Sequence, residues 1–126
     1  MKLQTTQKDG KLYGKLPDTG WIDIQFTSND WKAREGSIYT PKFRKIGNIV
    51  FLQGQFATKQ VLNAGNHSVY TTNLPPPSRQ HTICTCSFLG NMINMWFTNN
   101  NITFKVYDNN FIDTIGVSID SCYIAD

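Results

Sequence analysis

Features that usually mark a membrane protein or a nucleic-acid-binding protein are missing from this sequence. No run of about 18 apolar residues occurs, so we expect no membrane-spanning helix. The opening residues, MKLQTTQKDGKLYG, contain no apolar stretch and do not look like a signal peptide. The net charge of +3 and the pI of about 8.8 are only mildly basic, and no nucleic-acid motif accompanies them, so we expect no nucleic-acid ligand.

Groups that carry out catalysis are also few. Glu35 is the one glutamate among nine acidic residues, and no motif sets two carboxylates across a cleft as a glycosidase requires. No GxSxG stretch presents a serine nucleophile. His67 and His81 are the only histidines, too few on their own for a zinc hydrolase, and the CxxC spacing of a metal site is absent. We therefore expect no enzymatic activity, no metal ion and no cofactor.

The three cysteines do not suggest a disulfide framework. They are an odd number, and Cys84 and Cys86 lie two apart, on the same side of any strand, where a bridge between them is rare. We predict that these two residues and Cys122 are reduced, largely buried thiols of a protein made in a reducing cytosol.

Helical patterns are scarce, and short β-rich runs separated by turn residues take their place. Hydrophobic residues make up 40% of the chain, enough for one core. The pattern predicts an all-β fold, an antiparallel β-sandwich or jelly-roll-like domain of about eight or nine short strands. The expected strands cover residues 21–26, 38–46, 49–58, 67–74, 81–89, 92–98, 102–108 and 115–125.

Glycine, asparagine and proline mark the connections between these strands. Gly47-Asn48 predicts a tight hairpin between two of the strands, and Pro41 indicates an edge or a bulge. The PPPSR segment at 75–79 predicts a stiff surface loop. Residues 1–18 are polar and predict a tether to something upstream, which leaves 19–126 as the folded domain.

Over residues 19–126 the sequence resembles the C-terminal head domain of tail and receptor-binding proteins of phages that infect Gram-positive bacteria. The hairpin is the most specific part of this resemblance, and the closing strand is the next. One departure lies in the proline loop, where Pro76 stands in place of the usual glycine. The resemblance rests on GWIDIQF, FRKIGNIVFLQGQF, NLPPPSR, INMWFTNNNITF and GVSIDSCYIAD.

The resemblance implies a homotrimer at the tip of a phage tail fibre or baseplate. It further implies host attachment by non-catalytic binding of a cell-wall saccharide, with the N-terminus joined to other tail or baseplate proteins. The protein would then be assembled in the host cytoplasm and located in the virion. Two alternatives stay open, namely a structural tail or baseplate module that binds no sugar, and a tail-associated glycan hydrolase.

Trp96 is the leading candidate for a saccharide contact. Strict alternation in MINMWFT assigns Ile93, Met95 and Phe97 to the core and places Trp96 and Asn94 on the opposite, polar face. A tryptophan there is a platform for a sugar ring, although packing in a subunit interface, where tryptophan is also enriched, is the favoured alternative. The remaining saccharide candidates are polar groups near strand ends and loops, namely His67, Arg79, His81 and Asp108.

The other two tryptophans have structural explanations. Trp31 is either a lid over the end of the sandwich or an exposed anchor, and we favour the lid. Trp21 opens a strand on its polar side, which suggests packing against the tether or a neighbouring chain.

Five cations gather in one part of the sequence, with Glu35 as the only acidic residue among them. They are either a solvated hairpin face or a patch for an anionic wall glycan, such as a phosphate-containing polysaccharide or a teichoic acid, because Arg and Lys both bind phosphate. The five are Lys32, Arg34, Lys42, Arg44 and Lys45.

Overall fold

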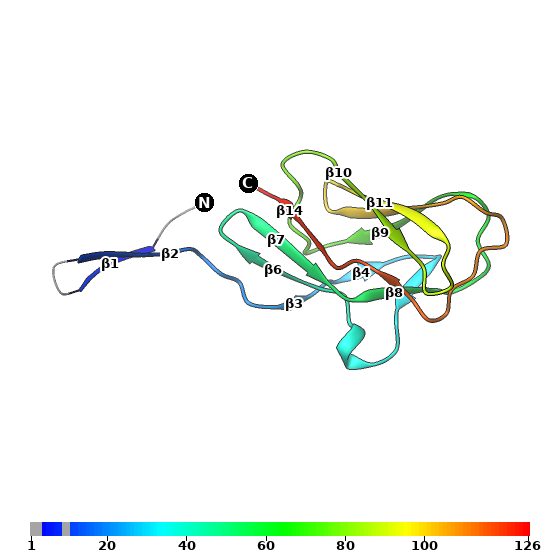
Figure 1. Ribbon diagram of the computed structural model, residues 1–126, viewed down its shortest axis with the longest axis horizontal. Coiled ribbons are helices and arrows are strands. Elements are labelled where there is room, and N and C mark those ends of the chain that lie inside the picture. Colours follow the sequence, from blue (N-terminus) through cyan, green and yellow to red (C-terminus); the bar gives the residue numbers. More distant parts are fainter. Residues whose placement is uncertain (1–3, 9–10) are drawn as a thin grey trace.

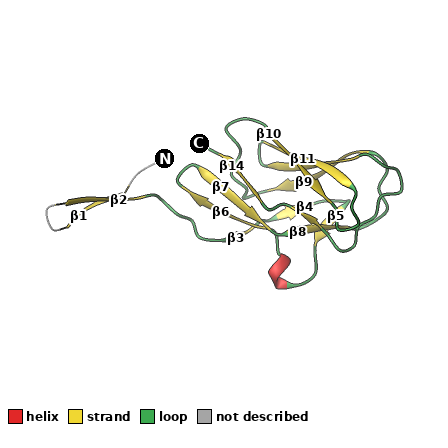
Figure 2. Ribbon diagram, in the orientation of Figure 1, coloured by secondary structure: helices red, strands yellow, loops and turns green. Residues whose placement is uncertain are grey.

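The protein is all-β, as predicted. The computed structural model describes residues 4–8 and 11–126, and the side chains of residues 16–126. Apart from a short 3₁₀ helix at Ser37–Tyr39, the described elements are strands, and the strands pair antiparallel (Figures 1 and 2). Among the described elements, no helix is long and apolar enough to cross a membrane.

The domain is a sandwich of two layers. The first layer is a five-stranded sheet and the second combines a four-stranded and a three-stranded sheet. The first runs in the order β10 (His81–Cys86), β11 (Met92–Thr98), β12 (Asn101–Val106), β9 (Gly65–Thr71) and β4 (Phe26–Thr27). The four-stranded sheet has the order β14 (Ser121–Ile124), β7 (Ile49–Gln53), β6 (Lys42–Ile46) and β3 (Ile22–Asp23). The three-stranded sheet has the order β13 (Val117–Ser118), β8 (Gln55–Thr58) and β5 (Trp31–Ala33).

Aromatic side chains from both layers interlock between them. Phe97 of β11 stacks on Tyr123 of β14, with ring centroids 5.0 Å apart. Phe104 of β12 meets Phe56 of β8 at 5.8 Å and Trp31 of β5 at 4.6 Å. Each fully buried ring of this kind contributes about 1.5–3 kcal/mol of hydrophobic stabilisation, so these contacts hold the two layers together.

The predicted hairpin at Gly47-Asn48 is present. Ile46 pairs directly with Ile49, so the loop has two residues, and Gly47 has a φ of 60°. Such two-residue loops match the twist of the flanking strands only with positive φ at the first position, which favours glycine there. The hairpin therefore follows from local sequence, and it joins β6 to β7 inside the four-stranded sheet.

The prediction of one continuous strand over 49–58 is wrong. The strand breaks at Gly54, where φ is 122°, and the chain passes from β7 in one sheet to β8 in another. The predicted strands at 21–26 and 115–125 are interrupted in the same way, into β3 and β4 and into β13 and β14. In the predicted strand 38–46, only Lys42–Ile46 is extended, because a 3₁₀ helix precedes Pro41. These breaks explain why the structure has more and shorter strands than predicted.

The predicted tether folds back on itself. β1 (Gln4–Lys8) and β2 (Lys11–Lys15) form an antiparallel hairpin, which Figure 1 shows beyond the end of the sandwich. Residues 1–3 and 9–10 of the predicted tether lie outside the described residues. The chain joins the domain where the Gly47 amide donates to the Pro17 carbonyl at 2.8 Å, close to the predicted boundary.

The three thiols are free, as predicted, but the prediction that they are buried is wrong. Cys84, Cys86 and Cys122 are all exposed. Cys84 pairs with Asn94 and Cys86 with Met92, which places both on the outer face of the five-stranded sheet. Ile83, directly before Cys84, packs against the core, so alternation along β10 alone accounts for the exposure of both cysteines.

Candidate functional site

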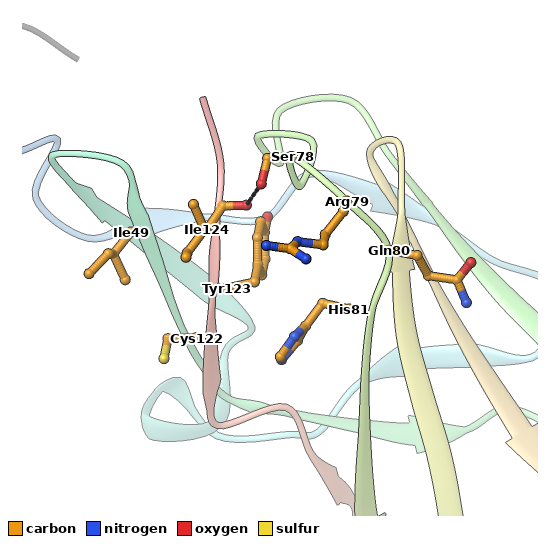
Figure 3. A pocket seen from close by; sticks show the side chains of 8 residues that line it. All are labelled: Ile49, Ser78, Arg79, Gln80, His81, Cys122, Tyr123 and Ile124. Atoms are coloured by element: carbon orange, nitrogen blue, oxygen red, sulfur yellow. Dashed lines mark hydrogen bonds between the residues drawn. The ribbon is translucent and has the colours of Figure 1, made fainter.

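A pocket of about 380 Å³ opens where the edges of the two layers meet, between β10 and β14 (Figure 3). Both are the outermost strands of their sheets, so the pocket lies at the rim of the sandwich. Arg79 and His81 line it on one side, and Ile49 and Cys122 on the other (Figure 3). Tyr123 lies between the two groups.

The proline loop is fixed against β14 and so shapes the pocket. The Ser78 amide and hydroxyl both donate to the Ile124 carbonyl, at 2.9 and 3.2 Å. The Tyr123 hydroxyl donates to the Pro75 carbonyl at 2.5 Å. Burial raises the pKa of the Tyr123 phenol above its ordinary value, so it stays protonated and keeps this bond near neutral pH. The stiff loop therefore holds the backbone of Arg79 at the pocket.

The floor of the pocket is aromatic. The His81 ring stacks on Phe97 with centroids 6.1 Å apart and planes 18° apart. Phe97 is fully buried and in turn stacks on Tyr123, so three rings form a continuous column whose two ends, His81 and Tyr123, line the pocket. This column fixes His81, while Arg79 remains exposed at the rim.

Such a lining is suited to a ligand with hydroxyl groups and apolar faces. The guanidinium of Arg79 is a planar donor, and the His81 ring adds a further polar edge, whereas the Gln80 side chain points away from both (Figure 3). Ile49 and Ile124 provide apolar surface. Small pockets that combine apolar walls with a few fixed polar groups are typical binding sites for small polar molecules.

The six predicted saccharide residues do not form one site, because only Arg79 and His81 come together. Trp96 is half-buried on the outer face of β11, where it pairs with Thr82 and Thr103, whereas His81 faces the core side of the same sheet. Asn94 shares the face of Trp96 and donates to the Tyr107 hydroxyl at 2.6 Å.

The remaining two candidates lie elsewhere. Asp108 is exposed after the end of β12. His67 pairs with Phe104 on the inward side of β9, with Nδ1 2.8 Å from the Asp30 carboxylate and Nε2 2.8 Å from the Asn63 carbonyl. His67 therefore ties two loops together and is not presented to a ligand.

Trp31 packs inside the domain, which agrees with the favoured packing role and contradicts the exposed anchor. Its side chain is fully buried and contacts both Phe104 and Phe111. Trp21, by contrast, is 46% exposed and lines a second hollow on the four-stranded sheet.

The predicted basic cluster divides between two sheets. Arg34 donates to the Gln55 side chain at 2.7 Å and lies 3.6 Å over the Tyr39 ring. Arg44 forms a bidentate pair with Asp18, and Lys45 donates to the Asp126 carbonyl at 3.1 Å. Lys32 is exposed on β5, Arg34 directly follows that strand, and Lys42 lies on β6 with Arg44. Three of the five cations are thus bonded within the chain.

No group of three or more His, Cys, Asp or Glu side chains that could hold a metal ion occurs in the described part of the chain. Several aspartates instead stabilise loops. Asp113 is buried and accepts hydrogen bonds from backbone amides, and Asp120 accepts one from the Gly54 amide at 3.0 Å. Asp30 accepts from His67 and from the Gln60 amide.

The Asp30 contacts predict a loss of stability in acid. Burial raises the pKa of Asp30, but hydrogen bonds from His67 and Gln60 outweigh this effect and hold the pKa below its ordinary value. A carboxylate whose pKa is lower in the folded state stabilises the fold at pH values above the ordinary carboxyl pKa of about 3.9. This stabilisation is lost as the pH falls through the folded-state pKa.

We expect Asp30→Asn to lower the free energy of unfolding by about 1 kcal/mol at pH 7, relative to the unchanged protein. The difference should shrink as pH falls below about 4 and be smallest below the depressed folded-state pKa, where Asp30 is protonated in the folded protein as well. Urea unfolding from pH 2 to 8 measures this, with the exposed Asp108→Asn as control. Parallel pH curves for Asp30→Asn and the unchanged protein would contradict the assignment.

Three of the five motifs that carry the resemblance noted in the sequence contribute residues to the lining of the pocket. The FRKIGNIVFLQGQF hairpin supplies Ile49, the NLPPPSR loop leads to Arg79, and the closing strand supplies Tyr123. Comparison with family models, curated proteins and solved structures gives no match to this chain.

Proposed function

We propose that this chain is the head domain of a phage receptor-binding protein and attaches the virion to its host by binding a cell-wall saccharide. The all-β sandwich agrees with the fold that the resemblance implies. The single observation that carries the proposal is the convergence of Arg79 and His81 in one pocket beside the stacked rings of Phe97 and Tyr123. That pocket offers both the polar edges and the apolar surface that a sugar needs.

Binding without catalysis is supported by the residues of the pocket. A glycosidase uses two carboxyl groups on either side of the scissile bond. No aspartate or glutamate is among the described residues that line this pocket. The lining therefore favours adhesion over the hydrolase alternative.

Assembly as a homotrimer at a tail tip or baseplate belongs to the same proposal. A small pocket with one arginine and one histidine would bind a saccharide weakly on its own. Three pockets in one head, repeated over several heads, raise the effective concentration and give strong attachment. The N-terminal hairpin would connect the domain to the other tail proteins.

The test is binding of the purified domain to cell-wall polysaccharide from a panel of Gram-positive strains. Arg79→Ala and His81→Ala should each weaken binding by about tenfold or more, because each removes a group that holds the ligand. Trp96→Ala is the matched control, since it removes a large aromatic from the opposite face of the sheet and should leave binding nearly unchanged.

Three outcomes would count against the proposal. Absence of binding to every polysaccharide would favour the structural module. Release of new reducing ends would favour the hydrolase. A loss of binding in Trp96→Ala, with Arg79→Ala unaffected, would move the site to the outer face of the five-stranded sheet.

A further inference from the structure

A row of large side chains crosses the outer face of the four-stranded sheet. Phe51 of β7 pairs with Cys122 of β14 on one side and with Arg44 of β6 on the other. Ile22 of β3 pairs with Phe43, so Trp21 stands next to Arg44 at the end of the same row. Because Phe43 points into the core, alternation places Trp21, Arg44 and Phe51 together on the outer face.

Trp21, Arg44 and Phe51 line a hollow of about 430 Å³. Trp21 is 46% exposed and Phe51 37% exposed, although β7 is an inner strand of its sheet. Packing within the domain gives no reason for aromatic rings on either side of Arg44 to remain open to water. Exposed rings beside polar groups are a common sign of a binding surface.

The polar groups of the hollow are already held in position. Arg44 bonds Asp18 through Nε to Oδ1 at 2.9 Å and through Nη2 to Oδ2 at 2.6 Å, which fixes the plane of the guanidinium. Asp120 accepts from the Gly54 amide, and the Ser121 hydroxyl donates to the Ile119 carbonyl. Groups that are ordered before the ligand arrives lose little entropy when they bind it.

The charge in the hollow favours a neutral ligand. Asp18 neutralises Arg44, and Asp120 adds a carboxylate near the rim, so a phosphate group would meet no net positive charge. A sugar ring instead presents a flat apolar face for Trp21 and Phe51 and hydroxyl groups for Arg44, Gln53 and Asp120.

We propose that this hollow, which we call the Trp21 hollow, is a second saccharide site. It shares β7 and β14 with the Arg79 pocket, because Ile49 and Ile124 line the pocket while Phe51 and Ser121 line the hollow. Ile49 and Phe51 are two residues apart on one face, about 7 Å along the strand. The two sites thus take neighbouring sugars of one chain, and the domain binds internal repeats of a polysaccharide as well as its end. This inference rests on the proposed saccharide-binding function.

The experiment uses oligosaccharide fragments of graded length, prepared from the wall polysaccharides of the same strain panel. NMR spectra follow the Trp21 indole N–H signal, assigned by its absence in Trp21→Phe, and the ring signals of His81. We expect both to shift with long fragments, and affinity to rise about tenfold or more from the shortest fragments to the longest. Trp21→Ala and Phe51→Ala should abolish that rise and leave the affinity for the shortest fragments unchanged.

Tyr70→Ala is the matched control, since Tyr70 is an aromatic residue 58% exposed on the other layer. Thermal unfolding checks that each variant is folded. Shifts at His81 without shifts at Trp21 would overturn this inference and leave the proposed function standing. Shifts at neither residue would overturn both. Conversion of an oligomer to monomers by Trp21→Ala and Phe51→Ala would show that a second copy of the chain covers the hollow, which also overturns the inference.

Discussion

Gly54→Ala should lower the free energy of unfolding by about 4 kcal/mol, a large part of the stability of a domain this size. The backbone φ at Gly54 is 122°, a conformation that costs any other residue about 1–3 kcal/mol. A Cβ atom there would also lie 2.6 Å from the Pro41 Cα and 2.7 Å from the Thr40 carbonyl oxygen. Those are backbone atoms and cannot move without displacing the start of β6, which adds a similar amount.

Thermal and urea unfolding measure this loss, and the melting temperature should fall by roughly 15 °C. Gly65→Ala is the control that separates the two causes, because Gly65 has a φ of 138° but no heavy atom within 4 Å of the added Cβ. We expect it to lose no more than about half as much stability. Equal losses in both variants would show that the contact with Pro41 costs nothing.

Asp113→Ala should destabilise the domain by about 3 kcal/mol. The Asp113 side chain is fully buried, and its two oxygens accept three backbone amides. Oδ1 accepts from Ile115 at 2.9 Å and Gly116 at 2.8 Å, and Oδ2 accepts from Phe88 at 2.9 Å. Alanine would leave the Ile115 and Gly116 amides without an acceptor, while the Phe88 amide would keep only its longer bond to the Gly116 carbonyl at 3.1 Å. Each unsatisfied buried group costs about 1–3 kcal/mol, partly recovered where water reaches it.

Urea unfolding tests this prediction, with Asp120→Ala as a graded control. Asp120 is exposed and accepts the single amide of Gly54, so its loss should cost about 1 kcal/mol or less. A cost for Asp113→Ala no larger than that of Asp120→Ala would mean that water or a rearranged loop satisfies the three amides.

Local patterns in the sequence were sufficient to predict the bounds and the buried residues of a strand that keeps one partner on each side. The 92–98 strand has the predicted bounds and the predicted core residues Ile93, Met95 and Phe97, because alternation reports which face meets the other layer. The Gly47-Asn48 hairpin was predictable because its turn depends on the φ of a single residue.

The same patterns could not show where the chain changes sheets. In IVFLQGQFAT four consecutive apolar residues lead up to Gln53 and Gly54, and β-forming residues continue beyond them, so the break depends on how closely Pro41 approaches from another segment. A glycine inside a strand was the one available signal, since it often marks a close backbone approach.

The candidate site was predicted in part. Arg79 and His81 were identified as polar groups near a loop, but their meeting with Tyr123 depends on the pairing of β14 with β7, which spacing alone does not specify. Trp96 and His67 were grouped with them because the sequence does not show that they face other directions. Phe51 was assigned only to an apolar strand, and the register that sets it beside Arg44 and Trp21 is a property of the folded sheet.

The strand order of the four-stranded sheet also determines when each part of the molecule forms. β6 and β7 are neighbours in sequence, and a hairpin of this kind closes within about 1–10 μs. β14 pairs with β7 across a long stretch of chain, for example Ser121 with Leu52, and such distant pairings slow the folding of β-rich domains to milliseconds or seconds. β14 is also the last of these strands to leave the ribosome. Because the Arg79 pocket and the Trp21 hollow both need β14, we expect the proposed binding surface to be the last part of the domain to assemble.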